Sequence, residues 1–129
     1  MGLFNSVFGK KTEREKKETR VPWIPLGSID QLDEIAEKSM TKSQLIFKHS
    51  TTCGISRMVL NMFTNSYSLE SAIDLYFLDL HAHREVSNAV QHKFQVIHQS
   101  PQLLIIKNGQ VVYHTSHGAI AETDLALYV

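Results

Sequence analysis

Hydrophobic and polar residues along the chain follow two spacings, one typical of strands and one typical of helices. The continuous apolar run 45–47 is short enough for a buried strand, and apolar residues recur at helical spacing after residue 53. This second set is expected to form one stripe that packs on a sheet, and it consists of Ile55, Met58, Val59, Met62 and Phe63. The stretch 44–63 is therefore predicted to be a strand, a loop and an amphipathic helix.

Further strands and helices are predicted on both sides of this stretch. Two prolines within residues 21–26 restrict any strand there to a short or edge position. Ser28 is expected to cap a helix. Its core-facing residues would be Ile29, Leu32, Ile35 and Ala36. The apolar run 75–80 predicts a central strand, and helical spacing returns at 84–94.

The last third of the chain begins with two strand-like runs, 102–107 and 110–114, which are separated by Asn108-Gly109. This dipeptide favours a tight antiparallel hairpin because both residues tolerate positive φ. A short final helix is expected at 120–128. The order of strands and helices predicts an α/β fold, a three-layer α/β/α sandwich whose right-handed crossovers give a mixed sheet of four to five strands.

Cys53 is the only cysteine of the chain, and it lies where the predicted helix starts. Free backbone N–H groups and the positive end of the helix dipole favour a thiolate at such a position. A lone cysteine is otherwise often a small buried hydrophobe. The neighbours of this one are polar or small rather than apolar: Ser50, Thr51, Thr52 and Gly54. The sequence therefore predicts a reactive thiol, beside which Gly54 leaves the backbone open to a partner.

Three basic side chains near Cys53 would also favour an anion: Lys48, His49 and Arg57. The charges of Lys48 and Arg57 are equally compatible with a solvated surface. All three side chains are expected to be at least partly solvated, so water would screen their charges and the helix dipole would dominate.

Pairs of histidines raise the question of a metal site. His81-Xaa-His83 and His114-Xaa-Xaa-His117 have ligand-like spacing. Neither pair has a visible cysteine or carboxylate partner, and structural zinc needs four ligands. No metal site is therefore predicted.

Length and composition indicate one domain. The chain has 129 residues, of which 43% are hydrophobic, and its 13 basic and 13 acidic side chains give no electrostatic case for nucleic-acid binding. Residues 21–129 are expected to fold as this domain. One cysteine forms no internal disulfide, and no secretory or membrane-spanning segment is visible, so we expect a cytoplasmic protein without stable membrane insertion.

Residues 1–20 form a basic arm that is expected to be disordered, since 10–20 contains no apolar residue. Apolar residues do occur near its start, on one side of a helix: Leu3, Phe4, Val7 and Phe8. The alternative to disorder is therefore a weak contact with a membrane or a partner through this segment.

Two motifs resemble the thioredoxin-fold superfamily over roughly residues 44–115. A strand leads to Cys53-Gly54-Ile55-Ser56 at a helix start, and Ser100-Pro101 precedes a hairpin that carries Lys107-Asn108-Gly109. Thioredoxins have a second cysteine where this chain has Ser56. Within the superfamily, Lys48 to Ser56 together with His98-Gln99-Ser100-Pro101-Gln102 resembles the monothiol bacilliredoxins, whose usual Cys-Pro-Ile-Ser has proline in place of Gly54.

The resemblance implies a thiol-disulfide oxidoreductase that needs no bound cofactor. It would reduce mixed disulfides between S-thiolated client proteins and a low-molecular-weight thiol, bacillithiol, with Cys53 as the nucleophile. It also implies that Pro101 is a cis proline facing Cys53 and that the backbone of Ser100 lines the substrate groove. The expected substrate contacts are Lys48, His49, Thr52, Gly54, Ile55, Ser56, Ser100 and Pro101.

Two other functions remain open. Cys53-Gly54-Ile55-Ser56 also fits the Cys-Gly-Xaa-Ser of monothiol glutaredoxins, which would make the protein an iron–sulfur carrier with a cluster held by Cys53 and an external thiol between two subunits. No Gly-Gly pair follows the hairpin, as glutaredoxins would require to hold glutathione. A non-enzymatic adaptor would instead have a buried, unreactive Cys53. His49 and His98 are the histidines expected near the site, where they would tune the thiolate.

Overall fold

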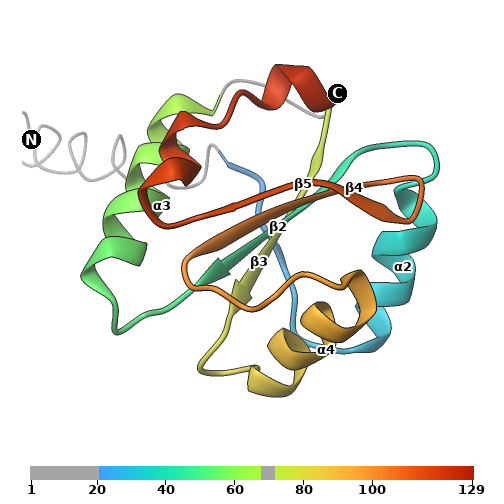
Figure 1. The fold of residues 1–129 in the computed structure, drawn as a ribbon, viewed down its shortest axis with the longest axis horizontal. Coiled ribbons are helices and arrows are strands. Elements are labelled where there is room, and N and C mark those ends of the chain that lie inside the picture. The colour runs from blue at the N-terminus through green and yellow to red at the C-terminus, as the bar shows by residue number, and fades with distance from the viewer. Residues whose placement is uncertain (1–20, 68–71) are drawn as a thin grey trace, which may run out of the picture.

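The computed structural model of the protein describes residues 21–67 and 72–129, so the predicted arm 1–20 lies outside the described residues. Helices cover both faces of a five-stranded sheet (Figure 1). The elements in chain order are β1 (Ile24–Pro25), α2 (Asp30–Lys38), β2 (Gln44–His49), α3 (Gly54–Ser66), β3 (Asp74–Asp79), α4 (Arg84–Phe94), β4 (Gln102–Lys107), β5 (Gln110–Ser116) and the 3₁₀ helices η1 (His117–Glu122) and η2 (Leu125–Tyr128).

The sheet is mixed, with strand order β1-β3-β2-β4-β5. β3 pairs in parallel with both β1 and β2, whereas β4 runs antiparallel to β2 and to β5. The predicted α/β class and mixed sheet are therefore confirmed. The hairpin is confirmed as well, because Asn108 and Gly109 have φ values of 53° and 76° between β4 and β5.

Each face of the sheet has its own core, because successive side chains of a strand point to opposite faces. Phe47 of β2 belongs to the core on the face of α3 and the 3₁₀ helices, which also includes Val59 and Phe63. Its neighbour Ile46 belongs to the core on the face of α2 and α4, which also includes Val90. All six residues of β2 are consequently buried.

The buried face of α3 differs from the predicted stripe. Ser56, Val59 and Phe63 face the sheet, whereas three members of the stripe are about half exposed: Ile55 (52%), Met58 (52%) and Met62 (48%). The hydroxyl of Ser56 bonds to His49 at the end of β2 and to the N–H of Ser50, so a polar side chain with hydrogen-bond partners occupies the buried face of the first turn of α3. The prediction from apolar spacing was wrong here because it assigned the buried face to the apolar residues alone.

Three smaller predictions were also wrong. Ile29, which was expected to face the core, is 51% exposed. The side chain of Ser28 does not cap α2. Instead, the side-chain oxygen of Gln31 accepts hydrogen bonds from the N–H groups of Gly27 and Ser28. The expected helix 120–128 is replaced by η1 and η2. Ile120 and Leu125, the buried residues of this segment, are five positions apart, a separation that does not match one helical stripe.

Candidate active site

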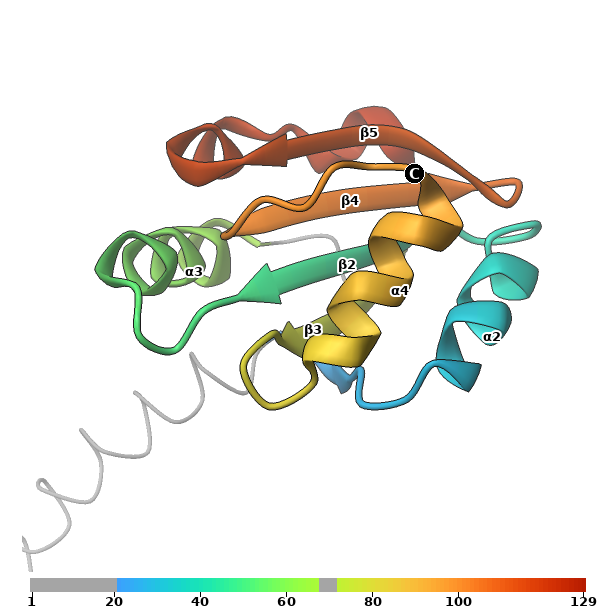
Figure 2. The ribbon, with the colours of Figure 1, turned by 60° about the horizontal axis from the view of Figure 1, so that its bottom comes forward.

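Three loops meet at one edge of the sheet, as Figure 2 shows for the ends of β2 and β3 and the start of β4. Lys48 near the end of β2 pairs with Gln102 at the start of β4, and the N–H of Leu80 donates to the carbonyl of His49. This register brings together the segments 50–53, 80–83 and 97–101. Most residues of the sequence-predicted site lie on or next to the first and third of these segments.

Cys53 is the residue directly before α3, and its backbone is extended (φ −103°, ψ 121°). Its N–H donates to the carbonyl of Ser50 over 3.2 Å, and its carbonyl accepts from the N–H of Arg57 over 3.2 Å. The cysteine is partly exposed. The predicted place of Cys53 at the helix start is confirmed.

Ser56, at the position of the second cysteine of thioredoxins, is completely buried. Its Oγ accepts a hydrogen bond from the N–H of Ser50 over 3.0 Å and lies 2.8 Å from Nδ1 of His49. Ser56 therefore links the backbone of Ser50 to the imidazole ring of His49. Burial lowers the pKa of His49, the charge of Asp79 opposes this, and Arg57 adds to it.

His81 reaches the Cys53 loop from the segment after β3. Its Nε2 lies 2.8 Å from Oγ of Ser50 and 3.1 Å from Oγ1 of Thr52. The carboxylate of Asp79 holds this segment by accepting from the N–H groups of His81 and Ala82. His81 was not among the predicted site residues. The signal that could have found it is its position just after β3, because β3 is parallel to β2 and the two strands end at the same side of the sheet. In the described part of the chain, no three histidine, cysteine or acidic side chains form a metal-binding group.

Lys48 does not extend into solvent. It is 0% exposed, its Nζ lies 3.3 Å from Nδ1 of His98, and it donates to the carbonyl of Ser87 on α4 over 3.5 Å. Burial lowers the pKa of Lys48 to about 8. The expectation that Lys48 and His49 are solvated is wrong, because β2 lies inside the sheet and both of its faces are covered.

The Ser100–Pro101 peptide bond is cis. Pro101 is buried, and its carbonyl accepts from the N–H of His117. Oγ of Ser100 is buried and has no hydrogen-bond partner among the described residues. The exposed site residues lie around Cys53: Thr52, Gly54 and Ile55.

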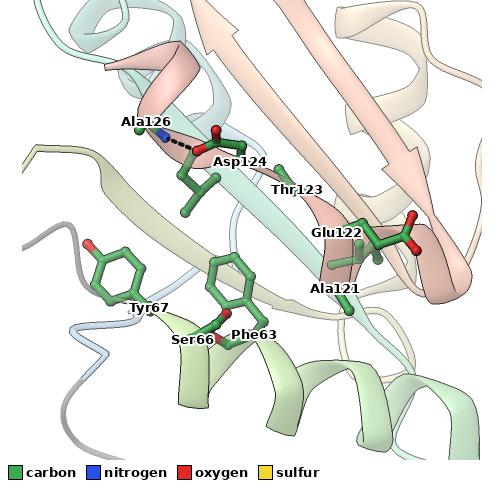
Figure 3. Close-up of a pocket in the computed structure, with 10 residues that line it drawn as sticks. Phe63, Ser66, Tyr67, Ala121, Glu122, Thr123, Asp124 and Ala126 are labelled. Carbon is green, nitrogen blue, oxygen red and sulfur yellow. Dashed lines mark hydrogen bonds between the residues drawn. The ribbon is translucent and has the colours of Figure 1, made fainter.

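A pocket of about 230 Å³ lies elsewhere, between the C-terminal end of α3 and the 3₁₀ helices (Figure 3). Phe63, Tyr67 and Asp124 are among its lining residues, and none of the predicted site residues is. Cys53 is at the opposite end of the 13-residue α3, about 20 Å away at 1.5 Å per residue. The pocket is therefore separate from the candidate active site.

The fold and the site define a protein of the thioredoxin-fold class. The chain is similar to a solved structure described as an oxidoreductase candidate with a thioredoxin fold, at 34% identity over 81% of this chain and 91% of that chain, with a TM-score of 0.69. Thioredoxins from Trypanosoma brucei brucei (13% identity, TM-score 0.63, 77% and 81% of the two chains) and Malassezia sympodialis (19%, 0.61, 76% and 81%) share the fold.

The family model of the monothiol bacilliredoxins matches residues 24–125. The chain belongs to this family. Among the described residues, no helix is long and apolar enough to cross a membrane.

Proposed function

We propose that the protein reduces mixed disulfides between client proteins and a low-molecular-weight thiol, with bacillithiol as the thiol and Cys53 as the only redox-active residue. The observation that carries this proposal is the position of a partly exposed Cys53 at the start of α3, beside a buried serine instead of a second cysteine. Family membership supports the same chemistry.

The reaction has two exchange steps. The Cys53 thiolate attacks the small-thiol sulfur of the mixed disulfide, so a Cys53–small-thiol disulfide forms and the client leaves as a thiolate that takes up a proton. A second small-thiol thiolate then attacks that sulfur, which gives the symmetrical small-molecule disulfide and returns the Cys53 thiolate. The reducing equivalents come from the second small thiol, whose sulfur is oxidised into the symmetrical disulfide while the client sulfur is reduced to a thiol. The small-thiol sulfur taken from the client is part of a disulfide before and after the reaction, and Ser56 takes no part in bond exchange.

The exposed surface beside Cys53 suits this substrate. Arg57 is exposed in the first turn of α3, where its guanidinium is available to a carboxylate of the small thiol. Ile55 and Ile97 are exposed apolar side chains on the two segments that border the site, and they suit a client polypeptide. We place the activity in a reducing, cytoplasmic environment, where a single cysteine remains free.

Intact-mass spectrometry tests the proposal on a model protein whose one exposed cysteine carries bacillithiol. The wild type should acquire one small-thiol adduct on Cys53 and release the model protein, Ser56→Ala should do the same, and Cys53→Ser should do neither. Glutathione and coenzyme A adducts on the same protein serve as matched substrates that identify the preferred thiol. Release by Cys53→Ser, or no release by the wild type, would contradict the proposal.

Cys-Gly-Ile-Ser at residues 53–56 favours a second candidate, an iron–sulfur carrier. Anaerobic purification separates the two functions. A brown protein with visible absorbance that depends on Cys53 and an added thiol supports the carrier, whereas a colourless protein that accepts the small-thiol adduct supports the reductase.

A further inference from the structure

Lys48 is a buried cation on the sheet face opposite α3. Its neighbour Phe47 packs in the core under α3, so Lys48 points toward α4 and contacts the carbonyl of Ser87. No salt bridge within residues 21–67 and 72–129 includes Lys48. An ammonium group buried without a carboxylate is unfavourable, and an apolar side chain of similar volume would often be more stable there. The position of Lys48 therefore calls for a role other than stability.

The contact with His98 links Lys48 to the loop before Pro101. Nδ1 of His98 lies 3.3 Å from Nζ of Lys48 and 3.4 Å from Oγ of Ser87. Side chains also hold the backbone of this loop. The side-chain oxygen of Gln91 accepts a hydrogen bond from the N–H of His98. The side-chain amide of Gln102 donates to the carbonyl of Ile97. His98 is two residues before Ser100, so its ring position constrains the backbone that leads to the cis Ser100–Pro101 bond.

The charged groups that act on His98 come from two elements. Partial desolvation of the ring lowers the pKa of His98, although the residue as a whole is exposed, and the positive charges of Lys48 on β2 and Arg84 on α4 lower it further. A neutral His98 can accept a hydrogen bond at Nδ1 from the Lys48 ammonium, whereas a protonated ring cannot. The contact therefore requires a neutral ring.

We propose that Lys48 is a positioning residue, which holds His98 and thereby fixes residues 98–100 as the wall of the groove where the mixed disulfide meets Cys53. This role rests on the proposed function, because it is defined by exchange at Cys53. Lys48 acts from the far face of the sheet and does not contact the substrate. A loosened wall would slow exchange with a bulky disulfide more than reaction with a small reagent.

The test compares Lys48→Met, His98→Ala, the double variant and Lys107→Met, the last a control at the opposite end of the hairpin strand β4. We expect Lys48→Met and His98→Ala each to slow exchange with the bacillithiol-modified model protein about tenfold. Alkylation of Cys53 by iodoacetamide should change less than about twofold. The double variant should be no slower than His98→Ala, because both changes remove one contact.

Nuclear magnetic resonance of the His98 ring gives a readout independent of activity. In Lys48→Met the pKa of His98 should rise toward its ordinary value, whereas Lys107→Met should leave it unchanged. Equal slowing of alkylation and exchange, or additive losses in the double variant, would overturn the positioning role. If Lys48→Met does not fold, His98→Ala removes the same contact from an exposed residue. If the wild type shows no exchange, both the proposed function and the positioning role are overturned. If the pKa of His98 does not change in Lys48→Met, only the positioning role is overturned.

Discussion

Oγ of Ser56 and Nδ1 of His49 lie 2.8 Å apart, and both side chains are buried. The contact joins the first turn of α3 to the end of β2 at the position where a dithiol protein has its second cysteine. Ser56 therefore fills that position with a side chain that cannot form a disulfide and that is hydrogen-bonded to the neighbouring strand and loop.

Replacement of Ser56 by alanine should lower stability without stopping exchange. The change leaves Nδ1 of His49 and the N–H of Ser50 without their partner, which costs about 1–3 kcal/mol per buried unpaired group. Urea unfolding measures the loss, and intact-mass spectrometry measures adduct formation on Cys53. Ser66→Ala, at the other end of α3, is the matched control, and equal stability of the two variants would contradict the assigned contact.

Stability should fall as the pH drops through the histidine range. The pKa values of His49 and His98 are lowered in the folded protein, whereas an unfolded histidine has its ordinary value of about 6.5. The unfolded state therefore binds more protons below about pH 6.5, and the folded state loses stability relative to it. Urea midpoints between about pH 5 and 7.5 test this, and a flat profile would speak against it.

Lys48 predicts a second pH effect at higher pH. Its folded pKa of about 8 lies below the ordinary value of 10.5, so the unfolded state binds more protons between these values. The contribution of Lys48 to stability should therefore rise from about pH 8 to 10.5. The stability difference between wild type and Lys48→Met should follow this rise, and a constant difference would show that the lysine is not desolvated.

Met62 and Phe63 are adjacent on α3 but should respond differently to truncation. Phe63 is buried, so Phe63→Ala should cost about 3–5 kcal/mol, whereas the half-exposed Met62→Ala should change stability by no more than about 0.5 kcal/mol. Chemical unfolding of both variants measures the difference. A large loss of stability in Met62→Ala would show that Met62 packs in the core, as the apolar spacing predicted.

Gly54→Ala should stabilise the protein. A Cβ at Gly54 meets no atom within 4 Å, so alanine should stabilise the protein by about 0.4–1 kcal/mol, chiefly because it restricts the unfolded chain. The thermal midpoint should rise while adduct formation on Cys53 is retained. Loss of the adduct would show that substrate needs the open backbone at this position.

The sequence predicted the parts of the fold that depend on local patterns. Apolar runs and the Asn108-Gly109 turn define β2, β3 and the hairpin, and the helix start at Cys53 follows from a change of spacing. The burial of Lys48 and the contact of His81 with Ser50 depend on which strands are neighbours and on what covers each face. Those are long-range relationships, and spacing along one segment does not contain them.

The two outer strands differ in what they offer to another chain. β1 has two residues, one of which is Pro25, and proline has no N–H to donate. That border of the sheet gives an incoming strand almost no ladder to extend. Strand addition is therefore limited to the seven-residue β5, on the opposite border, so it would pair two copies β5 to β5 as a closed dimer and could not continue into a fibre.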